Sequence, residues 1–165
     1  MSITCRPISA EQHLAFVQQR GSASFLQTPA WAKVKPEWRG ESIGFFAGTE
    51  LTGVALVLYR QLPKLKRYLA YLPEGPVLDW SRPDVDDHLR ALVSYAKRSK
   101  AFAVRIGPAV PHRRWRADTI KAAIADDAVT TLSQVTPDET TLVGTRVINQ
   151  LIHGGWHTDE SGHGF

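Results

Sequence analysis

The chain has 165 residues, of which 43% are hydrophobic and 22% are charged. These values are close to those of ordinary globular domains, so they exclude a disordered tail, and the ordinary glycine and proline content excludes a collagen-like chain. The 20 Lys and Arg against 16 Asp and Glu give a formal net charge of +4. This charge favours anionic partners in general, among them nucleic acids, nucleotide-linked substrates and anionic lipid surfaces.

The first residues and the cysteine count bear on cellular location. The single cysteine, Cys5, cannot form an intrachain disulfide, and residues 1–6 lack the apolar core of a secretory signal peptide. We therefore expect a cytoplasmic chain. The longest uncharged apolar stretch, residues 51–59, is less than half of the ~20 apolar residues that a membrane helix requires, so any contact with a membrane is expected to be peripheral.

The N-terminal part of the chain predicts a strand followed by two short helices. Ser9 is placed to cap the first helix, with Gln12 at the spacing of a capping box and Gly21 as the residue that stops it. The second helix is predicted to begin at Thr28-Pro29, because proline favours the first helical position, and to end before Pro36.

A β-hairpin and a further strand are predicted next. Residues 41–47 and 51–62 are rich in Ile, Phe, Val and Leu, and the Gly-Thr-Glu sequence at 48–50 separates them as a turn. The second run is almost wholly apolar, which is typical of a strand covered on both faces. After the basic turn 64–67, residues 68–72 indicate another strand.

The C-terminal half alternates between helical and strand patterns. Residues 83–98 carry apolar side chains at helical spacing, with acidic residues near the start and basic residues near the end, an order that suits the helix dipole. The remaining elements are expected to be a strand at 101–106, a helix at 116–125, a strand at 130–135 and a helix at 138–152. Because strands and helices alternate, we predict an α/β domain with a mixed sheet and flanking helices.

The histidine-rich C-terminus suggests a metal site at first sight. His153, His157 and His163 lie near Asp159 and Glu160, but a glycine pair between the first two histidines is expected to break the helix that would place them on one face. We therefore expect a solvated tail and no structural metal.

Nucleophilic catalysis has no sequence motif in this chain. Cys5 lies in the predicted first strand, where a cysteine is expected to be a buried small hydrophobe. A Gly-x-Ser-x-Gly segment, which would expose a serine nucleophile, does not occur. The sequence therefore gives no signal for an enzyme nucleophile.

Two clusters combine basic and aromatic residues. The His-Arg-Arg-Trp-Arg sequence at 112–116 has the composition of a nucleic-acid contact, although such runs on a basic protein are more often solvated loops. The second cluster, residues 31–38, places Lys33 and Lys35 between two tryptophans at the end of a predicted helix. The two lysines point in different directions there, so at least one of them is expected to face a cleft.

The second cluster is part of a longer pattern. Residues 25–35, Phe-Leu-Gln-Thr-Pro-Ala-Trp-Ala-Lys-Val-Lys, followed by Trp38, resemble the N-terminal signature of the Fem-type transferases (the FemA, FemB and FemX group), which build the peptide bridges of peptidoglycan. Residues 71–79, Tyr-Leu-Pro-Glu-Gly-Pro-Val-Leu-Asp, resemble a second segment of that family, and a helix and the strand containing Arg105 follow in the family's order. The resemblance extends over essentially the whole chain.

The resemblance implies both a fold and a function. The fold would be acetyltransferase-like (GNAT), and the reaction would transfer an amino acid from aminoacyl-tRNA, as co-substrate and with no cofactor, to the stem peptide of a peptidoglycan precursor, either lipid II or UDP-MurNAc-pentapeptide. Lys35 is expected to contact the diphosphate of the precursor, and Lys33, Trp38 and Arg105 are further expected substrate-binding residues. The catalytic residues are not assigned.

The sequence departs from the family pattern in two ways. Relatives often carry an acidic residue before the proline that follows the Arg-containing strand, whereas this chain has Gly107-Pro108. Family members also contain two acetyltransferase-like domains in tandem. Residues 1–165 are therefore expected to form a truncated, N-terminal domain of a Fem-type transferase that lacks the second domain and is inactive alone.

Two other functions stay open at this stage. One is an acyl-CoA-dependent GNAT N-acyltransferase, although the chain lacks the Arg/Gln-x-x-Gly-x-Gly/Ala loop that would bind the diphosphate of coenzyme A. The other is a non-catalytic RNA-binding module that uses the basic cluster at 112–116. Retention of a lipid-linked precursor but not of bare RNA would favour the Fem-type function.

Overall fold

A computed structural model describes residues 2–158 of the chain. The chain divides into two compact units, with the boundary between Ala109 and Val110, and each unit is described by itself below.

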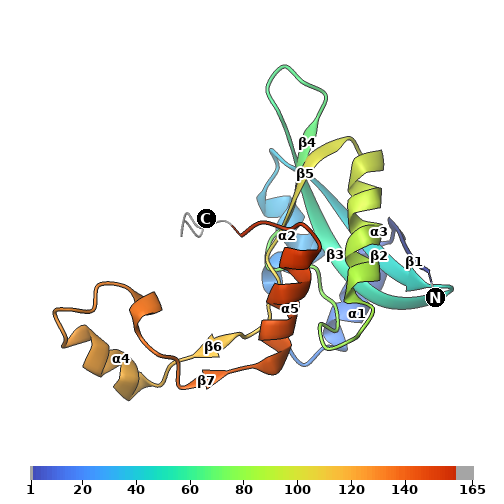
Figure 1. Ribbon diagram of the computed structural model, residues 1–165. Helices are drawn as coiled ribbons and strands as arrows, with labels where there is room; N and C mark the ends of the chain where they lie inside the picture. Colours follow the sequence, from blue (N-terminus) through green and yellow to red (C-terminus); the bar gives the residue numbers. More distant parts are fainter. Residues whose placement is uncertain (1, 159–165) are drawn as a thin grey trace. The chain divides into compact units, whose positions relative to one another are not determined.

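The first unit is built on one five-stranded sheet with the strand order β1-β2-β3-β4-β5 (Figure 1). The pairings from β1 to β4 are antiparallel, and β4 pairs with β5 in parallel. The sheet is therefore mixed, as predicted. Its strands are β1 Ile3–Pro7, β2 Arg39–Ala47, β3 Glu50–Gln61, β4 Tyr68–Leu72 and β5 Ala101–Ile106.

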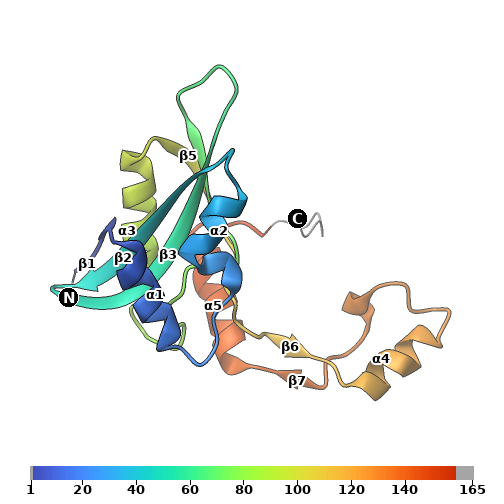
Figure 2. The same ribbon diagram turned by 180° about the vertical axis from the view of Figure 1, so that it is seen from behind.

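Helices cover both faces of this sheet. The helix α3, Val85–Arg98, joins β4 to β5 and packs on one face (Figure 1). The opposite face, seen in Figure 2, carries α1, Ala10–Gln18, the 3₁₀ turn η1, Phe25–Gln27, and α2, Pro29–Val34. This arrangement confirms the predicted fold class, a mixed sheet with flanking helices.

The hydrophobic core confirms that β3 is covered on both faces. Residues 54–59 of this strand are at most 2% exposed. Ala55, Val57 and Tyr59 belong to the cluster under α3, together with Ile43 and Phe45 of β2. The intervening residues, including Leu56, face the side of α1 and α2 and are equally buried, because neighbouring side chains on a strand point to opposite faces.

Several local signals act as predicted. The capping box at the start of α1 is present, with reciprocal bonds between Ser9 and Gln12. Pro29 is the first residue of α2, and the helix ends before Pro36 with Lys35 as its C-cap. Thr28 caps without a side-chain bond to the helix, since its hydroxyl donates to the carbonyl of Phe25 instead.

The described residues of the second unit, 110–158, form two helices and a small two-stranded antiparallel sheet. The elements of this unit are β6 Arg113–Arg114, α4 Ala117–Ile124, the 3₁₀ turn η2 Leu132–Gln134, β7 Glu139–Thr140 and α5 Leu142–His153. The predicted helix at 116–125 is therefore confirmed.

The strand predicted at 130–135 is wrong. The side-chain carbonyl of Gln134 accepts hydrogen bonds from the backbone N–H groups of Thr130, at 2.8 Å, and of Thr131, at 2.9 Å. These local bonds fold the segment into the turn η2, because polar side chains that satisfy nearby backbone groups compete with strand pairing.

The last helix begins later than predicted. Thr141 caps α5 by accepting from the backbone N–H of Gly144 at 3.1 Å. Asp138, the predicted first residue, binds elsewhere: its carboxylate accepts from the backbone N–H of Arg116 at 2.7 Å and from the hydroxyl of Thr119 at 3.0 Å.

Two further expectations concern membranes and metals. Of the helices in the described part of the chain, none is long and apolar enough to cross a membrane. Residues 2–158 contain no group of three or more His, Cys, Asp or Glu side chains that could hold a metal ion. His163, Asp159 and Glu160 lie outside the described residues.

Candidate functional site

The first half of the site is the segment that carries Lys35. The α2 helix ends at Val34, and the chain turns so that the backbone N–H of Trp38 donates to the carbonyl of Lys35 at 2.9 Å. The Lys35 ammonium lies 5.8 Å from the ring centre of Trp31, and Trp31 in turn packs edge-on against Phe25 at 5.4 Å. Lys35 is half-buried, whereas Lys33 is exposed.

The second half is a row in which two neighbouring rings lie between two guanidinium groups. The Trp38 and Tyr71 rings lie 6.1 Å apart, the Arg60 guanidinium lies 5.6 Å from the Trp38 ring, and the Arg105 guanidinium lies 5.6 Å from the Tyr71 ring. Each contact is within the usual reach of a cation–π or aromatic pair. We call these four residues the aromatic–arginine row.

Strand pairing brings the row together. Tyr71 of β4 is the register partner of Arg105 in β5, so the two side chains lie on the same face of the sheet. Arg60 comes from β3, and Trp38 immediately precedes β2. Three neighbouring strands and the turn after α2 therefore supply one continuous patch on the face opposite α3.

Gln27 joins the two sequence segments that carry the family resemblance. Its side chain is fully buried and donates from Nε2 to the carbonyl of Pro73 at 2.6 Å, while its Oε1 accepts from the backbone N–H of Leu56 at 3.0 Å. The peptide N–H of Leu56 is always a donor, so the amide orientation of Gln27 is fixed by its partners. The segment 25–38 is thereby tied to the segment that follows Tyr71.

Glycine is required where the second segment passes Gln27. A Cβ atom at Gly75 would lie 2.3 Å from the side-chain carbon Cδ of Gln27. The carbonyl of Gly75 also accepts from the backbone N–H of Gly107 at 3.1 Å. Gly107 is thus held against this segment, and a Cβ at Gly107 would approach the backbone nitrogen of Glu74 to 3.2 Å.

The row has the chemistry of an anion-binding surface. Arg60 and Arg105 provide fixed positive charge and several N–H donors each. Burial raises the pKa of the Tyr71 phenol, and the Arg105 charge acts in the opposite direction. The Tyr71 hydroxyl therefore keeps its proton at neutral pH. These groups suit binding and orientation of a phosphate or carboxylate.

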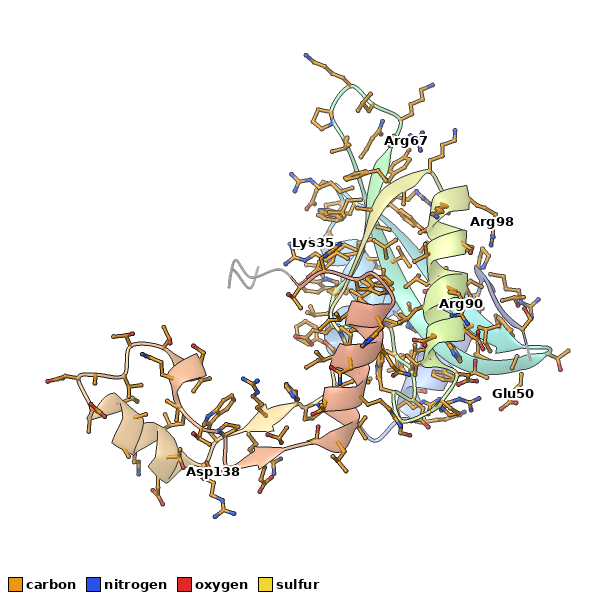
Figure 3. All side chains as sticks on the ribbon, viewed as in Figure 1. Lys35, Glu50, Arg67, Arg90, Arg98 and Asp138 are labelled. Atoms are coloured by element: carbon orange, nitrogen blue, oxygen red, sulfur yellow. The ribbon has the colours of Figure 1, made fainter. Side chains whose placement is uncertain are left out.

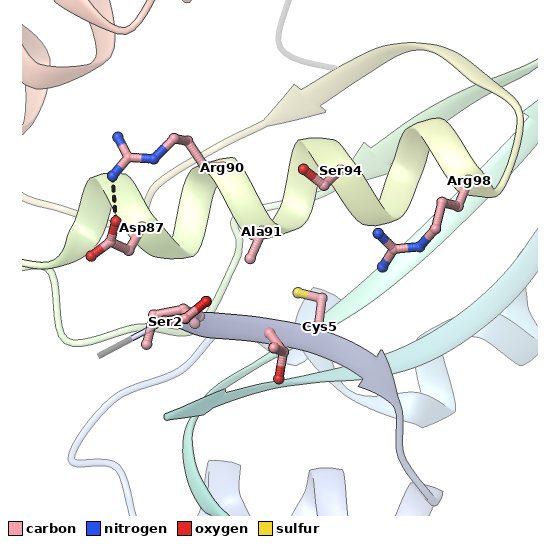
Figure 4. A pocket seen from close by; sticks show the side chains of 9 residues that line it. Ser2, Cys5, Asp87, Arg90, Ala91, Ser94 and Arg98 are labelled. Atoms are coloured by element: carbon pink, nitrogen blue, oxygen red, sulfur yellow. Dashed lines mark hydrogen bonds and ion pairs between the residues drawn. The ribbon is translucent and has the colours of Figure 1, made fainter. Parts of the chain in front are cut away.

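A separate hollow lies between β1 and α3, on the other side of the first unit. Figure 4 shows it, lined by Cys5 on β1 and by Arg90, Ser94 and Arg98 on α3. Arg90 is paired with Asp87 across one turn of the helix. Burial raises the pKa of the Cys5 thiol to about 12, although the Arg98 charge partly opposes this. Cys5 is thus buried, as predicted.

The basic cluster at 112–116 is largely engaged in the structure of the second unit. The Trp115 indole N–H donates to the carbonyl of Val135 at 3.0 Å, and the Arg114 guanidinium lies 3.5 Å from the Glu139 carboxylate. The ring that would stack on a base is half-buried and bonded. This weakens the case for an RNA-binding module.

The predicted site residues fall into three groups. Trp38 and Arg105 are brought together because both contact Tyr71. Lys35 lies against Trp31, one helical turn before it in the chain. Lys33 is exposed and has no ring contact of its own in the described part. Sequence reasoning missed Tyr71, Arg60 and Gln27 as site residues. Gln27 and Tyr71 lie in the two motifs that carry the resemblance, which is the sequence signal that could have indicated them.

Comparison with known proteins identifies the family. The model of the FemAB family matches residues 8–139. This chain belongs to the FemAB family. The resemblance stated from its sequence motifs is thereby confirmed, and both segments joined by Gln27 lie inside the matched region.

Curated FemAB relatives include lipid II:glycine glycyltransferases. Those of Staphylococcus epidermidis are 34% identical over 109 residues, which is 62% of this chain and 26% of the relative. Those of Staphylococcus aureus are 33% identical over 106 residues, with 62% and 25% covered. The chain therefore spans about a quarter of the length of the curated relatives it matches.

The comparison with solved structures finds FemX and, at lower similarity, an acetyltransferase. The crystal structure of FemX matches with a TM-score of 0.52 at 31% identity, over 61% of this chain and 26% of that chain. A ribosomal-protein-alanine N-acetyltransferase from Brucella melitensis biovar Abortus 2308 matches at 12% identity with a TM-score of 0.42, over 84% of this chain and all of that chain. The sheet order described above, rather than this weaker likeness, establishes the α/β fold class.

Proposed function

We propose that this FemAB chain binds the diphosphate-bearing part of a peptidoglycan precursor for aminoacyl transfer onto the stem peptide. The curated relatives are lipid II:glycine glycyltransferases, which supports a transferase of cell-wall synthesis. The acceptor would be lipid II or UDP-MurNAc-pentapeptide, and the donor would be aminoacyl-tRNA, which is found in the cytoplasm. The chain would supply the N-terminal, precursor-binding domain of such a transferase.

The observation that carries the proposal is the patch of positive charge on aromatic rings. Lys35 lies on Trp31, while Arg60 and Arg105 lie on the linked rings of Trp38 and Tyr71. A diphosphate is recognised by cations with N–H donors, and the rings hold those cations in defined positions. Buried Gln27 ties the segment that carries Lys35 and Trp38 to the segment that follows Tyr71.

The proposed reaction needs positioning more than covalent catalysis. The amine nitrogen of the acceptor attacks the ester carbonyl of the aminoacyl-tRNA, so that a C–N bond forms, the ester C–O bond breaks, and the proton leaves the amine as the tRNA hydroxyl is released. Such a step gains from holding both substrates close and from donors near the developing oxyanion.

The binding part of the proposal is tested by calorimetric titration of this chain with UDP-MurNAc-pentapeptide. Lys35→Ala is expected to weaken binding by about 1–3 kcal/mol, because it removes a charged hydrogen-bond donor. Lys33→Ala serves as the matched control, since it removes the same charge from the same helix end. Its effect is expected to be smaller.

The salt dependence of binding and the thermal midpoint distinguish a direct contact between Lys35 and the substrate from a general effect of the substitution. The difference between wild type and Lys35→Ala should shrink as salt is added, because exposed charges are screened. Both lysine variants should keep the thermal midpoint of the wild type. Equal affinity of the wild type and Lys35→Ala at low salt would eliminate Lys35 as a diphosphate ligand.

Catalysis is tested separately. We expect this chain by itself to transfer no labelled amino acid from charged tRNA to lipid II, because it would hold only the precursor-binding domain. Turnover at about 1 per second, within the usual range of enzymes, would contradict the proposed division of labour while leaving the binding result intact.

A further inference from the structure

The loop between β3 and β4 is an exposed basic segment of the first unit. Residues 62–67 read Leu-Pro-Lys-Leu-Lys-Arg, and the loop extends beyond the sheet in both ribbon views. The backbone N–H of Leu62 donates to the carbonyl of Arg67 at 2.9 Å, and the N–H of Leu65 donates to the carbonyl of Leu62 at 3.3 Å. The loop is thus a hydrogen-bonded turn with a definite tip.

The residues at this tip are not explained by the turn itself. Lys64 has a φ of 65°, the left-handed conformation that glycine adopts most easily, yet the chain places a lysine there. Leu65 is 56% exposed and lies in sequence between two exposed lysines, Lys64 and Lys66. An apolar side chain framed by cations thus projects into solvent.

The neighbouring segments add charge of the same sign. The backbone N–H of Tyr68, where the loop returns to the sheet, donates to the carbonyl of Lys100 at 3.2 Å, so the C-terminal end of α3 lies beside the loop. Two stretches of the first unit meet at this end, residues 60–70 and 95–103, and neither contains an acidic residue, while Glu41 on the neighbouring strand β2 is paired with Arg39. In Figure 3, Arg67 lies at this end of the sheet and Glu50 at the other.

The positive charges of the loop are not neutralised by salt bridges within the described residues. Within the described residues, no salt bridge involves Lys64, Lys66 or Arg67. Their charge is therefore available to an external partner.

We propose that the β3–β4 loop docks this chain on an anionic lipid bilayer, with Leu65 entering the interface and Lys64, Lys66 and Arg67 contacting lipid phosphates. An apolar residue framed by cations is the composition of an interfacial anchor, because buried apolar area and attraction to anionic lipid act together. A single-stranded nucleic acid would instead favour aromatic rings as stacking platforms. The loop itself has none, and Tyr68 at its base packs against Tyr59 and Arg39.

Docking by this loop would also orient the candidate site. The loop leaves the sheet one residue after Arg60 and returns in β4, the strand that carries Tyr71. Membrane contact at the loop would therefore hold the aromatic–arginine row close to the bilayer. This orientation of the site rests on the proposed function, whereas docking of the loop on a bilayer does not. The experiment therefore uses no precursor.

The test is co-sedimentation of this chain with vesicles of phosphatidylcholine, with and without phosphatidylglycerol. The loop variant carries Lys64→Gln, Lys66→Gln and Arg67→Gln. The matched control carries Arg113→Gln, Arg114→Gln and Arg116→Gln, which remove the same charge from the second unit. Each cation near an anionic surface contributes roughly a fivefold change in partitioning, so the loop variant should lose at least about tenfold in binding to phosphatidylglycerol vesicles.

The remaining variants separate the outcomes. Leu65→Ser leaves the charge unchanged and should weaken binding severalfold. Neither Leu65→Ser nor the triple loop variant should shift the thermal midpoint, since the altered side chains are exposed. The control variant should bind nearly as the wild type does. The proposal is overturned if the wild type does not bind phosphatidylglycerol vesicles, if the loop and control variants lose equal affinity, or if the loop variant loses affinity for tRNA but not for vesicles.

Discussion

The side-chain amide of Gln27 lies 2.6 Å from the carbonyl oxygen of Pro73, 46 positions later in the chain. The same amide group accepts from the N–H of Leu56 in the central strand β3. One buried side chain thus connects the turn before α2, the middle of the sheet and the loop after β4. The geometry of the candidate site depends on this connection, because Trp38 follows the first of these segments and Tyr71 precedes the last.

Removal of this amide should be costly. Gln27→Leu keeps a similar volume but leaves the Pro73 carbonyl and the Leu56 N–H buried without their partner, so we expect a loss of about 2–4 kcal/mol in the free energy of unfolding. Gln61→Leu is the control, because Gln61 is exposed and its side chain makes a single bond to the carbonyl of Leu65. Urea denaturation measures both. Similar losses in the two variants would contradict the role given to Gln27.

A second prediction concerns the close approach of Gly75 to Gln27. Gly75→Ala would place a methyl group 2.3 Å from Cδ of Gln27, so the variant should lose about 1–3 kcal/mol through overpacking. Shortening the neighbour in the double variant Gln27→Ala/Gly75→Ala should make room for that methyl group. The two losses should therefore not add, and a double-mutant cycle should give a coupling energy of at least about 0.5 kcal/mol. If the two losses in stability simply add, the close contact between the new methyl group and Gln27 is relieved in some other way.

The pH dependence of stability should include a contribution from His13. This side chain is fully buried, and its Nδ1 lies 2.9 Å from the hydroxyl of Ser42. Burial lowers its pKa from 6.5 to about 4, although the nearby backbone of Gln27 acts in the opposite direction. Because the folded state binds the proton less readily, stability is full above pH 6.5 and falls as the pH drops towards 4.

The slope from one such group is at most about 1.4 kcal/mol per pH unit. Thermal or urea unfolding of the wild type and of His13→Gln across this pH window measures the contribution of His13. The variant should lose the part of the pH dependence of stability that His13 provides. His153→Gln is the control, because His153 is exposed at the end of α5. An unchanged slope in His13→Gln would mean that His13 is charged or hydrated in the folded protein.

Sequence reasoning predicted the elements whose signals are local. The capping box at Ser9, the proline at the start of α2 and the strands 68–72 and 101–106 all follow from neighbouring residues. Ile43 and Phe45, which alternate along the strand predicted at 41–47, are both fully buried. The segment 130–135 failed because Gln134 bonds its own neighbours, which an apolar pattern does not reveal.

The candidate site was predictable only in part, for a different reason. Trp38 and Arg105 were singled out from their motifs, but their connection through Tyr71 depends on the pairing of β4 with β5, which sets Tyr71 opposite Arg105. Arg60 enters for the same reason. A register between distant strands is fixed by the packing of the whole sheet, so no local pattern identifies these neighbours.

The last prediction uses the strained tip of the β3–β4 loop. Leu62-Pro63-Lys64-Leu65 has proline at the second position of the turn and a positive φ, 65°, at the third, the pattern of a type II turn that favours glycine there. Lys64→Gly should therefore relieve the cost of a left-handed non-glycine residue, about 1–2 kcal/mol. Part of this gain is offset by the greater freedom of glycine in the unfolded chain, about 0.5–1 kcal/mol.

We accordingly expect Lys64→Gly to leave stability unchanged or raise it by up to about 1 kcal/mol, while it weakens binding to anionic vesicles. Lys66→Gly removes the same charge from a position without a positive φ, so it should weaken vesicle binding similarly but lower stability. Urea denaturation and vesicle co-sedimentation of both variants give the two readouts. A loss of stability in Lys64→Gly equal to that in Lys66→Gly would show that Lys64 is not strained, whereas undiminished vesicle binding in both would remove the loop from the membrane contact.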